Sequence, residues 1–297
     1  MEAILSTMHI HWICSALGVL PEQITGIEKN RLGLNNDTYI LSIGDAAYFY
    51  RIPGFGTQLF CNRARERLSY QQVAPWRMTD EVLAYDPDSG CKLTVYYPGS
   101  HTVRTDQPEA LRAAMDLLRR FHALPVTFGT IDSHFQRLAR YERFAVDAGG
   151  QLSADFYAMK QKFVPLQKRI EAIPALVCPA HGDFIPDNVL IRPRGEPILL
   201  DLEFTAMGDP LEDLGTFCHH GDLRPEAVER LLRIYLRREP EPLERFKTFA
   251  FCATAGLMWY TWAAYKLTAG ADRRTYQAFA DRSLAYCAEM LQMANRL

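Results

Sequence analysis

Residues 181–203 constrain the fold of this chain more than any other stretch. They include two polar segments, H-G-D-F-I-P-D-N at 181–188 and D-L-E at 201–203. Two short apolar runs, 188–191 and 197–200, lie between them and are separated by the turn-forming residues R-P-R-G-E. This pattern predicts two strands joined by a tight connection. The fold must therefore hold a small hairpin with a polar loop at each end.

The side chains of these two loops match the needs of phosphoryl transfer. That reaction requires a carboxylate near the attacking hydroxyl and oxygen ligands for Mg²⁺ at the phosphates. Asp183 supplies a base, Asn188 five residues later supplies a metal ligand, and Asp201 and Glu203 complete the metal shell. A lone H-x-D pair could bind a transition metal, and an Asp could be only a helix N-cap. Neither alternative accounts for all four residues together.

The residues on the two sides of Pro98-Gly99 follow different patterns. The first part has short runs of branched and aromatic residues, with a tight turn at Gly44-Asp45, which predicts strands. The later part has helical spacing, beginning with a helix capped by Asp106. We expect an α+β fold: a small antiparallel sheet with one helix over 1–97, and a larger, mainly helical part over 98–297. The expected strands are 23–31, 38–43, 47–52, 82–85 and 92–97, and the expected helices are 60–73, one from 106, 153–173, 225–238, 243–268 and 273–296.

The charge balance bears on the kind of partner. The chain has 297 residues with 33 basic and 35 acidic side chains, a formal net charge of −2. A nucleic-acid-binding protein is expected to show a basic excess. We therefore expect a small-molecule partner and no nucleic acid, while the sequence leaves the oligomeric state open.

The cysteines indicate a reducing compartment. Seven are scattered without a C-x-x-C motif or a close pair, which is typical of reduced thiols and not of disulfides or a zinc site. The first residues, M-E-A-I, do not resemble a signal peptide. We expect a cytoplasmic protein.

One uncharged segment, residues 248–265, approaches the length of a membrane span. It contains Thr254, Gly256, Thr261 and two tryptophans, and the chain has no second segment of this kind. This polarity favours a buried helix that faces a pocket over a membrane span.

The motif H-G-D-x-x-P-x-N-x-L-I, followed by L-D-x-E-x-x-x-x-G-D-P-x-x-D-L, resembles the choline/ethanolamine kinase and aminoglycoside phosphotransferase superfamily. The resemblance implies the bilobal protein-kinase-like fold of those proteins. It implies that Asp183 is the catalytic base, that Asn188 and Asp201 bind Mg²⁺, and that Glu203 is a further acid of the metal site. Asp213 corresponds to an acid that supports the catalytic loop.

Two segments of the first part are similar to bacterial choline kinases. R-I-P-G follows the third expected strand, and N-R-x-x-E begins the expected helix. The resemblance implies that Arg51 takes the place of the usual Lys at the ATP phosphates and that Glu66 pairs with it.

The resemblance also places two nucleotide-binding segments. Residues 33–39, which include Asn36, lie between the first two strands, where a phosphate-covering loop belongs. Residues 94–97, which include Val95 and Tyr97, correspond to the hinge whose backbone holds adenine.

The acceptor site is expected on the uncharged helix. Trp259-x-x-Trp262, with Tyr265 nearby, resembles a W-x-x-W helix of choline kinases, whose rings would hold a quaternary ammonium. Aromatic residues at this spacing also occur as ordinary core. Choline kinases usually have a Glu seven residues after the acid that corresponds to Asp213, and here that residue is His220.

These observations predict an ATP- and Mg²⁺-dependent enzyme that phosphorylates the hydroxyl of a small amino alcohol, choline or ethanolamine. Alternatives are an aminoglycoside or thiamine kinase of the same superfamily, or a catalytically inactive nucleotide-binding pseudokinase. A pseudokinase is expected to lack the base or a metal ligand, whereas Asp183, Asn188 and Asp201 are all present. A metal-dependent hydrolase would group more His and acidic ligands than His181 and Asp183.

Overall fold

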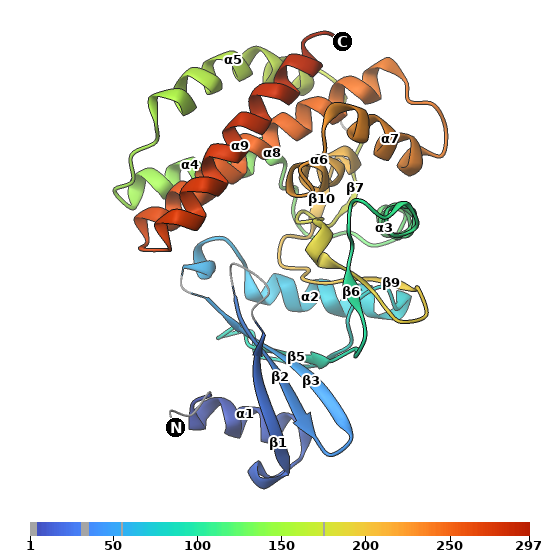
Figure 1. Ribbon diagram of the computed structural model, residues 1–297, viewed down its shortest axis with the longest axis vertical. Helices are drawn as coiled ribbons and strands as arrows, with labels where there is room; N and C mark the ends of the chain where they lie inside the picture. Colours follow the sequence, from blue (N-terminus) through green and yellow to red (C-terminus); the bar gives the residue numbers. More distant parts are fainter. Residues whose placement is uncertain (1–4, 31–35, 55, 175) are drawn as a thin grey trace. The chain divides into compact units, whose positions relative to one another are not determined.

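A computed structural model describes residues 5–30, 36–54, 56–174 and 176–297 (Figure 1). The chain forms two compact units, each with its own core. The first unit comprises Met1–Thr102 and Val189–Phe204, and the second comprises Val103–Asn188 and Thr205–Leu297. An antiparallel sheet dominates the first unit and helices dominate the second, which confirms the expected α+β class.

The first unit is built on a five-stranded antiparallel sheet with the strand order β1-β2-β3-β5-β4. Successive side chains on a strand point to opposite faces. On β3, Tyr50 lies against Trp12 of α1 with 5.6 Å between ring centroids, whereas Arg51 pairs with Glu66 of α2. The sheet therefore has an apolar face and a charged face. The elements are α1 (Thr7–Leu17), β1 (Ile24–Asn30), β2 (Asn36–Ile43), β3 (Ala46–Pro53), α2 (Arg63–Val73), β4 (Val82–Tyr85) and β5 (Lys92–Val95).

A three-stranded sheet completes the first unit, with the order β6-β8-β9 from β6 (His101–Thr102), β8 (Val189–Ile191) and β9 (Pro197–Leu199). The expected hairpin is thus present. A bridge from Thr79 to Leu199 also joins it to the connection between α2 and β4. These contacts group the hairpin with the first unit, whereas the sequence placed it in the part 98–297.

Seven helices of the described chain form the second unit, together with a two-stranded sheet of β7 (Cys178–Ala180) and β10 (Ala206–Gly208). The helix α8 packs against α4, α6 and α9 (Figure 1). The helices are α3 (Pro108–His122), α4 (His134–Asp147), α5 (Ala154–Glu171), α6 (Pro210–His220), α7 (Pro225–Leu236), α8 (Pro242–Thr268) and α9 (Arg273–Ala294). Short 3₁₀ turns lie at Pro21–Gln23, Thr57–Leu59, Ala74–Trp76 and Pro186–Asn188.

The uncharged segment 248–265 lies within α8 and is buried along nearly its whole length. At Gly256 a Cβ atom would come within 2.7 Å of the Ser283 carbonyl oxygen, so the glycine allows α9 to approach closely. No described helix combines the length and the apolar composition that a membrane crossing requires. All seven cysteines are unpaired.

Two helices of the second unit, α4 and α6, were not expected from the sequence, although each carries a start signal. Ser133 accepts a hydrogen bond from the Gln136 amide at 3.3 Å, and the Gln136 side chain accepts one from the Ser133 amide at 3.0 Å, which is a capping box. Asp209 caps α6 by accepting from the Leu211 amide at 3.1 Å. The strands β7 and β10 were also missed, because three residues are too few for a visible alternation.

Candidate active site

The loop that carries Asp183 is closed on itself by Asn188 in the second unit. The Asn188 side-chain amide donates to the Asp183 carboxylate and to the Asp183 carbonyl, each at 2.9 Å. The Asn188 backbone amide donates to the Ile185 carbonyl at 3.0 Å. Because its NH₂ group is engaged in this way, the Asn188 side-chain oxygen is the atom that can face a cation.

The Asp213 carboxylate fixes the start of the same loop. It accepts from the backbone amides of His181 at 2.7 Å and Gly182 at 2.8 Å. It also pairs with His122 Nε2 at 2.9 Å. Burial opposes ionisation of Asp213, but the hydrogen bond and charge of His122, together with His181, bring its pKa below the usual value. The supporting role implied for Asp213 thus has a geometric basis.

Arg137 on α4 supports the loop from a second side. It is 1% exposed and donates to the Gly182 carbonyl. Asp132 holds it in place with an N–O distance of 3.2 Å and also pairs with Arg140 at 3.0 Å. Burial opposes ionisation of Asp132, and the two arginines bring its pKa below the usual value. Sequence reasoning missed Arg137, because the contact joins positions 45 residues apart.

In the first unit, Arg51 and Glu66 form the expected ion pair between β3 and α2. The distances from the Arg51 guanidinium to the Glu66 carboxylate are 2.7 and 2.9 Å. Arg51 also donates to Asp201 Oδ1 at 2.6 Å. Burial opposes ionisation of Glu66, but Arg51, Lys92 and Arg63 lower its pKa to about 2. The side chain expected at the ATP phosphates is therefore held by two carboxylates.

Glu203 lies in the same network but is held by Arg63, at 2.7 Å. Arg63 also donates to Glu66 at 2.9 Å. Burial and the neighbouring charges of Asp201 and Glu66 raise the pKa of Glu203 to about 7. Arg63 was not expected as a site residue, although it is the Arg of the N-R-x-x-E segment.

Asp201 adopts a left-handed backbone conformation with φ of 61°, which is uncommon for a residue other than glycine. Its backbone amide donates to the Tyr70 hydroxyl at 3.1 Å. That hydroxyl also accepts a hydrogen bond from Lys92, and Lys92 in turn lies 3.5 Å from Asp80. Strain of this kind persists only where surrounding contacts hold it, and it is concentrated at functional sites.

The two expected nucleotide segments are only partly described. Residues 33–35 of the phosphate-covering segment lie outside the described residues, and Asn36 begins β2. In the expected hinge, the Val95 amide donates to the Glu81 carbonyl at 3.0 Å and the Tyr96 amide to the Ala47 carbonyl at 3.1 Å. Both amides are therefore engaged within the unit. The backbone groups of this segment that remain for hydrogen bonds to adenine are carbonyl groups and the Tyr97 amide.

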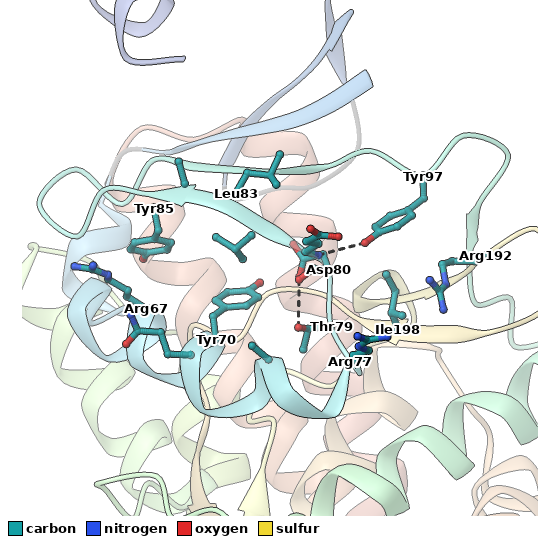
Figure 2. A pocket seen from close by; sticks show the side chains of 15 residues that line it. Arg67, Tyr70, Arg77, Thr79, Asp80, Leu83, Tyr85, Tyr97, Arg192 and Ile198 are labelled. Carbon is teal, nitrogen blue, oxygen red and sulfur yellow. Dashed lines mark hydrogen bonds between the residues drawn. The ribbon is translucent and has the colours of Figure 1, made fainter. Parts of the chain in front are cut away.

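A cavity of about 1040 Å³ lies in the first unit between α2 and β4. Figure 2 shows Tyr70 and Tyr85 toward one end, Tyr97 and Arg192 toward the other, and Asp80 between them. Of the residues expected in the site, Tyr97 alone lines it. The cavity nevertheless adjoins the Arg51 network, because the Tyr85 hydroxyl of its lining donates to the Glu66 carboxylate at 2.7 Å.

The second unit gathers an aromatic cluster from three helices, formed by His220, Trp259, Trp262, Tyr276 and Phe279. The ring centroids of Trp259 lie 4.5 Å from His220 and 5.3 Å from Trp262. Trp262 lies 5.4 Å from Tyr276 and 5.7 Å from Phe279. The structure thus brings together three of the four expected acceptor residues, and the α9 rings were missed.

The fourth expected acceptor residue, Tyr265, is 5% exposed and lies one turn further along α8. His220 is neutral at physiological pH, because burial and the charge of Arg282 lower its pKa to about 3. The cluster therefore has an uncharged imidazole at the position where choline kinases usually have a Glu.

The described residues contain no group of three or more His, Cys, Asp or Glu side chains placed to hold a metal ion. The donors that remain for a hard cation are the Asn188 side-chain oxygen and the Asp201 and Glu203 carboxylates. Mg²⁺ usually binds one or two protein carboxylates and completes its shell with water and substrate phosphates. Each of these side chains is of the type that such a site uses.

Comparison with known proteins identifies the family. Residues 26–246, more than half of the chain, match the model of the phosphotransferase enzyme family. The protein LicA of Haemophilus influenzae is 24% identical over 245 residues, covering 79% of this chain and 71% of LicA.

Solved structures share the fold. The choline kinase LicA from Streptococcus pneumoniae has a TM-score of 0.80 at 19% identity, covering 95% of this chain and 98% of LicA. A choline/ethanolamine kinase family protein from Mesorhizobium loti has a TM-score of 0.78 at 24% identity, covering 97% of this chain and 99% of that chain. The chain belongs to the phosphotransferase enzyme family and has the kinase-like fold of these proteins.

Proposed function

We propose that this enzyme transfers the γ-phosphoryl group of ATP to the hydroxyl of choline or ethanolamine, with Mg²⁺ as cofactor. The observation that carries the proposal is the fixed loop of Asp183. Asn188, Asp213 and Arg137 hold that loop through four hydrogen bonds to backbone groups and one to the carboxylate itself. A loop held in this way keeps a carboxylate in position without reorganisation during the reaction.

Asp183 would accept the proton of the acceptor hydroxyl as the oxygen attacks phosphorus. Asn188 and Asp201 would hold Mg²⁺, and Glu203 would be a further acid of that site. Bound Mg²⁺ would neutralise phosphate charge. Two oxygen atoms are suitable ligands: the Asn188 side-chain oxygen and Asp201 Oδ2. The other carboxylate oxygen of Asp201, Oδ1, accepts a hydrogen bond from Arg51.

For the nucleotide, we propose that Arg51, positioned by Glu66, meets the phosphates and that Asn36, Val95 and Tyr97 contribute to the binding of ATP. LicA has also been solved in complex with AMP, at a TM-score of 0.79 with this chain. A guanidinium binds phosphate oxygens in a forked geometry that suits this role.

The aromatic cluster is the proposed site of the acceptor's amino group. Its rings offer π faces to a cation, which favours an amino alcohol over a polycationic aminoglycoside. Thiamine is the next acceptor to test. We place the enzyme in the cytoplasm, where its seven free cysteines would remain reduced.

The test is ADP release from ATP and Mg²⁺ with choline, ethanolamine, thiamine or an aminoglycoside as acceptor. We expect turnover that depends on choline or ethanolamine. Turnover with thiamine or the aminoglycoside alone would keep the reaction type and replace the acceptor. Nucleotide binding without turnover of any acceptor would favour a pseudokinase.

A further inference from the structure

His220 lies at the end of α6 and contributes the one nitrogen heterocycle of the aromatic cluster that can accept a hydrogen bond. Its ring meets Trp259 edge-on, with 4.5 Å between centroids and an interplanar angle of 84°. It also lies 5.8 Å from Phe279. The imidazole is thus held by rings from α8 and α9.

Two buried nitrogens of the cluster, His220 Nε2 and Trp259 Nε1, have no hydrogen-bond partner within the described part of the chain. On the neighbouring His219, which lies outside the cluster, Nε2 lies 3.0 Å from Ser283 Oγ and Nδ1 has no partner among the described residues. Buried polar atoms are nearly always hydrogen-bonded, so two adjacent exceptions point to a missing partner. A ligand with hydrogen-bonding groups could supply it.

Two cations lie against rings of the cluster, and the Asp272 carboxylate acts on Tyr276 from the start of α9. The Lys266 ammonium lies 5.7 Å from the centre of the Trp262 ring, and the Arg282 guanidinium lies 5.1 Å from that of Phe279. Part of the π-face attraction is therefore already used by side chains of the protein. The uncharged imidazole of His220 adds no compensating negative charge. Hydrogen bonding is left as the means by which this cluster can distinguish one amine from another.

The cluster is connected to the catalytic loop inside the same unit. Phe184, next to Asp183, stacks on Phe217 of α6 with 5.2 Å between ring centroids. Phe217 lies one turn before His220 on that helix. A group bound at His220 is therefore bound by a helix that packs on the loop of the proposed base.

We infer that His220 is a specificity-determining residue that selects acceptor alcohols whose nitrogen carries an N–H, such as ethanolamine, over a quaternary ammonium such as choline. The inference rests on the proposed function. A protonated primary, secondary or tertiary amine donates an N–H to the lone pair of a neutral imidazole. Choline carries the same charge but has no N–H, so Arg282 and Lys266 act on both alike and the imidazole does not.

The experiment is calorimetric titration of the full-length protein with ethanolamine and its mono-, di- and trimethylated forms. The first three carry an N–H when protonated, whereas the trimethylated form, choline, is a quaternary ammonium without an N–H. We expect little change over the first two methylations and a loss of about tenfold in affinity at the third, the size of one hydrogen bond. A smooth trend with methyl number, or choline bound as tightly as ethanolamine, would overturn the inference.

Variants separate hydrogen bonding from packing. His220→Phe keeps a ring but removes the nitrogen, and we expect it to abolish the step at the third methylation. His220→Gln restores an acceptor and should retain the step. Phe279→Leu, the control, removes a ring without a hydrogen bond and should weaken all four amines equally. A step that persists in folded His220→Phe contradicts the assignment.

ADP release measured on the same amines separates the two proposals. The methylation step without turnover would sustain the role of His220 and reject the kinase function. Turnover of these alcohols, with equal affinity for ethanolamine and choline, would sustain the kinase function and reject the role of His220. Failure of every amine to bind would reject both.

Discussion

At the scale of single residues, the ionisation of each buried acid is set by what surrounds it. Asp213 and Glu203 are both buried, at 0% and 5% exposed. Asp213 accepts from two backbone amides and His122, which favours its charged form. Glu203 shares its surroundings with Asp201 and Glu66, which favours its neutral form. Burial alone therefore does not decide the charge state of either.

Asp213→Asn should destabilise the second unit. An amide oxygen cannot replace a carboxylate that accepts three hydrogen bonds, and we expect a loss of roughly 2–4 kcal/mol in the free energy of unfolding at pH 7. Because the pKa of Asp213 is lower in the folded than in the unfolded state, the carboxylate stabilises the fold fully at pH values above its unfolded-state pKa. This contribution is lost as pH falls through the folded-state pKa. Urea titration measures both effects. Asp281→Asn, at an exposed position, is the control, and equal stability of the two variants would contradict the account.

Glu203→Gln should change how stability depends on pH. With a folded pKa of about 7, raised from 4.5, the wild-type side chain binds a proton on folding, so stability is lost as pH rises from about 5 to 8. The full shift corresponds to a loss on the order of 3 kcal/mol. Glutamine does not titrate, so the variant should lose less stability over this range in metal-free urea titrations. A parallel pH profile for both proteins would show that Glu203 is ionised throughout.

The sequence revealed the acids of the site better than the groups that hold them. Asp183, Asn188, Asp201 and Glu203 stand in one short stretch with a recognisable spacing. Arg137, Tyr70 and Lys92 reach that stretch from other helices and strands, through contacts that exist only after folding. A single buried Arg or Tyr leaves no periodic signal, which is why these partners could not be predicted.

At the scale of elements, α8 organises the second unit. Packing explains the glycine of this helix, because Gly256 lies against the Ser283 carbonyl and against Cys287 of α9. The Trp259 and Trp262 rings face α6 and α9 from the same helix. The uncharged composition that approached the length of a membrane span is thus the consequence of burial by neighbouring helices.

Gly256→Ala should reduce stability by roughly 1–3 kcal/mol, because the new Cβ would meet the Ser283 carbonyl at 2.7 Å. In an open helix the same change would be stabilising by about 1 kcal/mol, so the sign itself is informative. Thermal unfolding measures the effect. Gly129→Ala, where no atom lies within 4 Å of the added Cβ, is the matched control. A stabilised Gly256→Ala protein would show that α8 and α9 are further apart.

Long, periodic elements were predictable, and short or polar ones were not. The sequence located the β3 and β5 strands and the α7 to α9 helices close to their observed bounds. It missed α1, α4 and α6, whose cap signals were not used. The strand pair β7 and β10 depends on pairing between distant segments, which no local pattern reports.

At the scale of the whole molecule, the division of the chain differs from the one drawn on the sequence. The first unit runs to Thr102 and includes Val189–Phe204, whereas a single boundary after residue 97 was expected. A hairpin that returns to an earlier unit cannot be recognised from composition, because its strands resemble any other short strands. The consequence is that Asp183 and Asn188 belong to one unit and Asp201 and Glu203 to the other.

If ATP binds with Mg²⁺, the whole chain should become more stable by mass action. At a ligand concentration of 100 times Kd, the expected gain is about 2.7 kcal/mol. Thermal unfolding with ATP and Mg²⁺, compared with ATP and EDTA, measures the metal-dependent part. Asp201→Asn should lose that part while keeping a response to nucleotide alone. An equal gain with and without metal would contradict the assignment of Asp201 as a ligand.

The central claim is that Asp183 is the base of a phosphoryl transfer, and Asp183→Asn tests it most directly. The measurement is kcat for ADP release with saturating ATP, Mg²⁺ and the best amino alcohol, beside Asp187→Asn, an exposed Asp of the same loop. The account predicts that kcat falls by about 10²–10⁴ in Asp183→Asn with KM little changed, and that Asp187→Asn retains activity. A kcat within about threefold of wild type in Asp183→Asn would contradict it, since removing a general base costs far more.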